Sequence, residues 1–102
     1  MVKIRLFCAA GMSTSLLVEK MEIAAKKRNL EVDIEAYPEA QIAKLLDNVD
    51  VALLGPQVAY KLPKIKVICD GKGVPVAVIP MVDYGLMNGE KVLDFALKLS
   101  GK

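Results

Sequence analysis

A short apolar strand, a loop of small and hydroxylic residues and an amphipathic helix follow one another in the segment Leu6-Phe7-Cys8-Ala9-Ala10-Gly11-Met12-Ser13-Thr14-Ser15-Leu16-Leu17-Val18. A strand–loop–helix unit directs backbone N–H groups and the positive end of a helix dipole at one spot. Cys8 lies at that spot, where a thiolate is stabilised by the same donors that would bind a phosphoryl group. The segment therefore predicts a cysteine nucleophile inside an anion-binding loop.

Strands and helices alternate along the rest of the chain. Strands are expected over residues 3–7, 31–36, 51–54 and 76–79, because these runs are apolar throughout or alternate apolar with polar residues. Helices are expected over residues 13–28, in a short segment whose first turn contains Pro38, over residues 58–70, and from about residue 88.

Capping and breaking residues set the expected element boundaries. Ser13 is a plausible N-cap of the first helix, and Asn29 is a plausible stop because it tolerates the left-handed conformation. Pro63 is expected to break or kink the third helix. The segment Pro80–Gly85, with Asp83 and Tyr84, is expected to be a loop.

Right-handed connections between these strands give an α/β fold with a single domain over residues 1–102. We predict an open four-stranded parallel sheet in the order 2-1-3-4, with helices on both faces. Ligand sites in such sheets lie beyond the carboxyl ends of the strands, where the strand order reverses. This topology brings Cys8, the turn Gly55-Pro56-Gln57 and the Pro80–Gly85 loop to one site.

Composition narrows the possible functions. The net charge of +2 does not favour a nucleic-acid partner, and the apolar stretches are shorter than the roughly 18 residues that a membrane span needs. The N-terminus reads as a strand, and two cysteines need no disulfide framework, so a reducing cytoplasm is the expected setting. Without histidine, the chain has no internal Cys-His pair and no histidine metal site, and we expect neither metal nor cofactor.

The Cys8 loop permits three interpretations. Low-molecular-weight tyrosine phosphatases have a cysteine, five residues, an arginine and then serine or threonine; here Thr14 stands at the arginine position, before Ser15. That arginine would clamp phosphoryl oxygens and stabilise the transition state, and Asp83 is the one candidate acid for a leaving group. A loop without the arginine suits a phosphoryl carrier, whose phosphocysteine must survive until its acceptor arrives. A binding module for a small anion would keep the loop and not require Cys8.

Three motifs resemble one known family. Residues 6–18, the run Leu53-Leu54-Gly55-Pro56-Gln57-Val58-Ala59-Tyr60 and the run Ile34-Glu35-Ala36-Tyr37-Pro38-Glu39 are similar to the signatures of the IIB component of the bacterial phosphoenolpyruvate-dependent sugar phosphotransferase system, in its lactose/cellobiose/N,N′-diacetylchitobiose class. The resemblance covers nearly the whole chain.

The resemblance implies a phosphotransferase without a cofactor. Cys8 would accept a phosphoryl group from a phosphohistidine on the IIA component, which supplies the missing histidine. It would pass the group to a sugar, a β-linked disaccharide such as cellobiose, chitobiose or lactose, bound by the membrane-embedded IIC component. Phosphate-binding loop positions are then Ala9, Ala10, Gly11, Met12, Ser13, Thr14 and Ser15.

Further residues have weaker expected roles. Gln57 and Tyr84 lie at the predicted active end and are possible members of the rim of the site. Met12, with Val82 and Leu86, is expected to dock partners, since methionine suits adaptable surfaces. Cys69 is expected to be a small buried hydrophobe. Because a carrier must release each partner, we expect a monomer when the protein is isolated.

Overall fold

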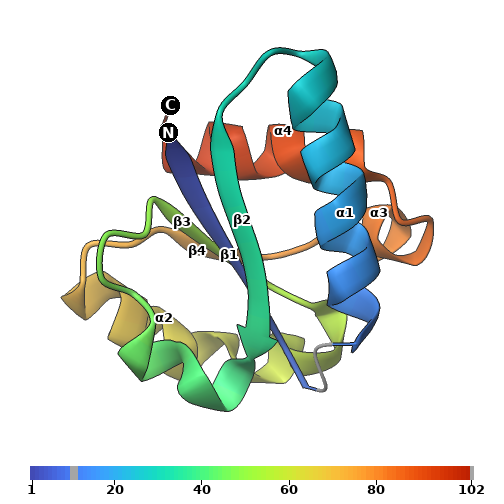
Figure 1. The fold of residues 1–102 in the computed structure, drawn as a ribbon. Helices are drawn as coiled ribbons and strands as arrows, with labels where there is room; N and C mark the ends of the chain where they lie inside the picture. The colour runs from blue at the N-terminus through green and yellow to red at the C-terminus, as the bar shows by residue number, and fades with distance from the viewer. Residues whose placement is uncertain (10–11, 102) are drawn as a thin grey trace.

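Four parallel strands form one sheet in the order β2-β1-β3-β4 in the computed structural model, which describes residues 1–9 and 12–101 (Figure 1). The strands are β1 (Val2–Cys8), β2 (Val32–Pro38), β3 (Val51–Leu54) and β4 (Val76–Val78). The predicted order is confirmed, and β1 pairs with β2 on one side and with β3 on the other. The reversal of strand order therefore lies between β1 and β3.

Helices cover both faces of this sheet (Figure 1). The first face bears α1 (Met12–Lys27), α3 (Met81–Gly85) and α4 (Gly89–Ser100), whose apolar residues share one core cluster with the strands. The second bears η1 (Glu39–Lys44), η2 (Pro56–Lys61) and α2 (Leu62–Gly71) around a separate cluster. The sheet thus separates two hydrophobic cores.

Alternation along the strands assigns each side chain to one of these cores. Ile4 and Leu6 of β1 belong to the cluster under α1 and α4, whereas Phe7 belongs to the cluster under α2. All four residues of β3 are buried, as a central parallel strand requires. The continuous apolar run at residues 51–54 was therefore a reliable strand signal.

The segment predicted as one helix over residues 58–70 is two elements, and that prediction was wrong at its start. A 3-10 helix, η2, already begins at Pro56, and Val58 departs from helical dihedral angles with φ −114° and ψ 20°. Pro63 does not break the following helix but occupies the first turn of α2. Proline is tolerated there because its missing N–H would have had no partner in the helix.

The first helix begins earlier than expected. Since α1 starts at Met12, Ser13 lies inside its first turn and the predicted N-cap was wrong. Its end was predicted correctly: Asn29 has φ 56°, and the Leu30 N–H donates to the Ala25 carbonyl at 2.9 Å. A left-handed residue followed by such a bond is a common way for a helix to end.

The predicted loop at residues 80–85 contains a one-turn helix. The Tyr84 N–H donates to the Pro80 carbonyl at 3.0 Å, which closes α3. Met87 then takes a left-handed φ of 50°, and the Asn88 side chain caps α4 by accepting from the Lys91 N–H at 3.1 Å. Burial of the Tyr84 ring in the core under α1 and α4 favours the helix over an open loop.

Helix α4 lies close to the backbone of α1 at Gly89. A Cβ built on Gly89 would lie 2.5 Å from the Lys20 carbonyl oxygen and would also meet the backbone carbon of that residue. Because the obstacle is helix backbone and not the end of a flexible side chain, the two helices would have to separate.

Replacing Gly89 with alanine should therefore destabilise the fold. We expect Gly89→Ala to lower the free energy of unfolding by about 1–3 kcal/mol, as overpacking typically does. Urea denaturation measures this change. The matched control is Gly85→Ala, whose added Cβ would meet nothing within 4 Å. Equal stability of the two variants would contradict the close crossing.

Candidate functional site

Cys8 ends β1 at the carboxyl edge of the sheet, where the strand order reverses. Its side chain is only 2% exposed. On one side Cys8 is in register with Pro38 of β2, and on the other the Gly55 N–H donates to the Phe7 carbonyl at 2.8 Å. Cys8 is thus almost fully buried at the carboxyl edge of the sheet.

Thr14 forms the contact that joins Cys8 to α1. Its side chain is fully buried in the first turn of that helix, with Oγ1 3.1 Å from Cys8 Sγ. The contact places the N-terminus of α1, where the dipole is positive, next to the sulfur. The residues of this first turn, Met12 to Ser15, include no carboxylate that would oppose an anion.

The chain's two arginines are bonded elsewhere. Arg5 donates to the Asp33 carbonyl at 2.8 Å and forms an ion pair with the Asp33 carboxylate at 3.1 Å. Arg28, just beyond the far end of α1, pairs with Asp94. A threonine hydroxyl therefore stands beside the sulfur, at the position where the phosphatase motif has its arginine.

Gly55 lets the end of β3 approach the site. The position that its Cβ would occupy lies 2.5 Å from Gln57 Oε1 and 3.2 Å from Cys8 Cβ. The backbone is not strained there, since φ is −64°. The missing side chain makes room for the Gln57 carboxamide beside Cys8.

Gln57 also reaches the third segment of the predicted site. Its Nε2 donates to the Tyr84 hydroxyl at 2.9 Å. The Tyr84 side chain is 8% exposed and belongs to the core under α1 and α4, so this bond crosses the end of the sheet from η2 to α3. The structure thus brings together Cys8, the Gly55-Pro56-Gln57 turn and the Pro80–Gly85 segment, as the topology predicted.

The remaining loop positions are described only in part. Ala9 and Ser15 are exposed, and Ser15 lies in the first turn of α1. Met12 and Ser13 belong to the same turn, but their side chains are outside the described part of the structure, as are Ala10 and Gly11. The sequence pattern predicted Thr14 as one of seven phosphate-binding positions, but it has no local signal for the side-chain contact of Thr14 with Cys8.

An apolar surface adjoins the site on α3. Met81, Val82 and Leu86 are more than two-thirds exposed, whereas Tyr84 between them is buried.

Cys69, the second cysteine, lies in the core under α2, where burial raises the pKa of its thiol. Only one of the two cysteines is therefore at the carboxyl edge of the sheet.

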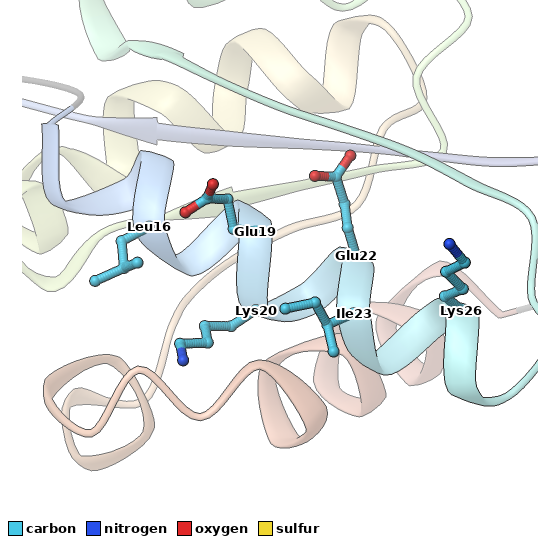
Figure 2. Close-up of a pocket in the computed structure, with 6 residues that line it drawn as sticks. All are labelled: Leu16, Glu19, Lys20, Glu22, Ile23 and Lys26. Carbon is cyan, nitrogen blue, oxygen red and sulfur yellow. The ribbon is translucent and has the colours of Figure 1, made fainter.

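A shallow hollow of about 380 Å³ lies on the surface of α1, and Figure 2 shows the side chains that line it. Its lining comes from that single helix, through Leu16, Glu19, Lys20, Glu22, Ile23 and Lys26. It includes neither Cys8 nor any residue of η2 or α3, so it is separate from the site.

Within residues 1–9 and 12–101, no helix has the length and apolar character needed to cross a membrane.

Comparisons with known proteins agree with this architecture. The family model for the lactose/cellobiose-specific IIB subunit of the phosphotransferase system (PTS) matches residues 3–95. The PTS system galactose-specific EIIB component of Lactococcus lactis subsp. cremoris (strain MG1363) is 46% identical over 101 residues, covering 94% of each chain. The PTS system cellobiose-specific EIIB component of Lactococcus lactis subsp. lactis (strain IL1403) has the same identity and coverage. The solution structure of the cellobiose-specific phosphotransferase IIB component protein from Borrelia burgdorferi superposes with a TM-score of 0.82 at 42% identity, covering 98% of this chain and 92% of the other.

Filling the space at Gly55 should disturb the site locally. We expect Gly55→Ala to displace the Gln57 carboxamide, to shift its side-chain amide signals in a ¹⁵N–¹H spectrum and to cost about 1–3 kcal/mol of stability. Gly71→Ala is the matched control, because its Cβ would meet nothing within 4 Å. Unchanged Gln57 signals in Gly55→Ala would mean that the carboxamide does not lie against Gly55.

Proposed function

The chain belongs to the lactose/cellobiose-specific IIB family of the phosphotransferase system, and from this premise we propose that Cys8 is its phosphoryl carrier. IIB components are phosphotransferase domains. The proposed donor is a phosphohistidine on a IIA component, and the proposed acceptor is a sugar bound by a membrane IIC component. The observation that carries the proposal is the contact of Cys8 Sγ with Thr14 at the N-terminus of α1.

In the proposed first step the Cys8 thiolate attacks phosphorus. The S–P bond forms while the N–P bond breaks, and the electron pair stays on the imidazole nitrogen of the donor. In the second step a sugar hydroxyl attacks phosphorus: the O–P bond forms while the S–P bond breaks, sulfur keeps the electron pair as the thiolate, and the hydroxyl proton passes to water or to a base on the IIC component. Positioning and charge neutralisation dominate such transfers, so the main task of the site is to bind and orient the phosphoryl group.

The loop and the first turn of α1 are the proposed phosphoryl-binding groups. Backbone N–H groups of Ala9, Ala10, Gly11, Met12, Ser13, Thr14 and Ser15 would donate to the phosphoryl oxygens. Each bond to an ionised acceptor contributes about 1.5–3 kcal/mol. The helix dipole adds about 0.3–1 kcal/mol when exposed and up to about 2 kcal/mol when partly buried.

The pairing of both arginines away from Cys8 favours a carrier over a phosphatase. An arginine fork would stabilise the transition state for attack by water, and Thr14 has only a hydroxyl to offer. A phosphocysteine in this environment should hydrolyse slowly. It would then persist until IIC presents its sugar.

The transported sugar is proposed to be a β-linked disaccharide such as cellobiose, chitobiose or lactose. Relatives named for galactose and for cellobiose are equally similar to this chain, so overall identity does not select one sugar. This equal similarity supports the proposal that the choice of sugar is made mainly by the membrane partner.

We also propose where and how the protein meets its partners. It would act in the cytoplasm as a monomer that binds IIA and IIC in turn. Because the phosphohistidine of IIA must reach Cys8, the surface of IIA around that histidine would contact α3 and the residue after it. Val82 of α3 and Leu86, its C-cap residue, are both exposed. These two residues, with Met12, are the proposed docking surface.

Phosphorylation should occur at Cys8 and nowhere else on the chain. Incubation with phosphoenolpyruvate, the two general phosphotransferase proteins and a cognate IIA should add the mass of one phosphoryl group to the intact protein. Cys8→Ser should abolish the gain, because the carrier sulfur is lost. Cys69→Ala is the matched cysteine control and should keep it.

Other outcomes would support the alternatives. Steady turnover of an aryl phosphate by the isolated protein would indicate a phosphatase. Phosphate binding that survives in Cys8→Ser, without any phosphoryl gain by the wild type, would indicate an anion-binding module.

Charge placed on the docking surface should weaken transfer from IIA. We expect Leu86→Asp to raise the KM for phosphorylated IIA about tenfold with little change in kcat. The lost apolar contact would contribute to the binding of IIA and not to the transfer step itself. Val67→Asp on α2 is the matched control, since Leu86 and Val67 are 72% and 73% exposed. An equal effect of both variants would argue against docking on α3.

A further inference from the structure

We infer that Tyr84 is a positioning residue that orients the Gln57 carboxamide beside Cys8, and that this carboxamide donates a hydrogen bond to the phosphoryl group during transfer. The inference rests on the proposed phosphoryl chemistry of Cys8. It assigns to a residue outside the Cys8 loop a direct contact with the transferred group, and to a second residue the task of orienting the first.

The hydrogen bond between the two side chains joins segments from opposite layers of the fold. Gln57 Nε2 donates to Tyr84 Oη at 2.9 Å, although the residues are 27 positions apart. Gln57 belongs to η2, whose buried residue Val58 packs in the core under α2, whereas Tyr84 packs in the core under α1 and α4. The bond therefore spans the carboxyl edge of the sheet, next to Cys8.

Gly55 fixes how near the carboxamide lies to the cysteine. Gln57 Oε1 and Cys8 Cβ lie 2.5 Å and 3.2 Å from one common point, the position that a Cβ on Gly55 would occupy. Any larger residue there would push the two side chains apart. The carboxamide and the cysteine thus border the same small space.

Tyr84 is a firm anchor for this arrangement. Its side chain is 8% exposed, and its backbone is fixed on both sides. The Tyr84 N–H donates to the Pro80 carbonyl at 3.0 Å, and the Met87 N–H donates to the Tyr84 carbonyl at 3.0 Å. Gln57, in contrast, is an exposed residue whose flexible side chain would otherwise sample many rotamers.

A neutral carboxamide suits the chemistry of a phosphoryl carrier. Its nitrogen has two hydrogens, and the bond to Tyr84 uses one of them. The second can be donated to a phosphoryl oxygen on Sγ, where charge develops on the equatorial oxygens during transfer. Unlike the phosphatase arginine, a carboxamide adds no charge that would strongly favour attack by water.

The test is a mutant cycle on single-turnover phosphorylation of Cys8 by phosphorylated IIA. We expect Gln57→Ala to lower the rate about tenfold to a hundredfold, and Tyr84→Phe to lower it about threefold to tenfold. The double variant should match Gln57→Ala alone, because Tyr84 acts through Gln57. Effects that multiply in the double variant, or a wild-type rate for Gln57→Ala, would overturn the inference.

Gln57→Glu separates a contact with the phosphoryl group from a structural role. The glutamate keeps the length of the side chain and can accept a hydrogen bond from the Tyr84 hydroxyl, but it places a negative charge beside the phosphoryl group. We expect a lower rate than for Gln57→Ala. A rate closer to wild type than that of Gln57→Ala would assign Gln57 a structural role only.

Matched controls and a second readout complete the experiment. Gln41→Ala on η1 and Tyr60→Phe on η2 alter exposed residues of the same types and should leave the rate unchanged. The ³¹P resonance of the phosphorylated protein should shift in Gln57→Ala and Tyr84→Phe but not in the controls, and an unshifted resonance would overturn the inference. If wild type and controls gain no phosphoryl group, the proposed function fails and the inference with it; if they do and Gln57→Ala equals them, the inference alone fails.

Discussion

The contact between the Cys8 thiol and the Thr14 hydroxyl, at 3.1 Å, is the interaction on which the site depends. It joins the end of the central strand β1 to the first turn of α1, and so places the sulfur at the positive end of a helix. The segments after β3 and β4 lie near this sulfur because the strand order β2-β1-β3-β4 reverses direction between β1 and β3, where ligand sites of parallel sheets are found. The Thr14 contact, the strand order and the dipole of α1 thus all act at the Cys8 sulfur.

The groups at this site suit binding of a phosphoryl group better than its hydrolysis. The proposed donors are backbone amides, hydroxyls and a carboxamide, while the arginines pair with Asp33 and Asp94 elsewhere. Neutral donors stabilise a dianion without strongly favouring attack by water. A transient phosphocysteine is the chemistry that such an environment suits, and it agrees with the family to which the chain belongs.

Much of the fold could be predicted because its signals are local. The apolar run Val51–Leu54 and the helix stop at Asn29 each depend on adjacent residues, and both were found where expected. The helix at residues 81–85 was missed, because burial of Tyr84 in a distant core stabilises it. The Gln57–Tyr84 bond was also missed, since a pair 27 residues apart has no local signature and needs the side-chain packing of both layers.

A ³¹P–¹H correlation spectrum of the phosphorylated protein tests the central claim most directly. The account predicts a cross-peak between phosphorus and the β-protons of Cys8, which are linked through the sulfur. A second set of cross-peaks should connect phosphorus to amide protons in the first turn of α1, as expected for a group bound at the helix N-terminus. A covalent correlation of phosphorus to the carbon-bound protons of any residue other than Cys8, or phosphorylation without a Cys8 cross-peak, would contradict the assignment of Cys8 as the carrier.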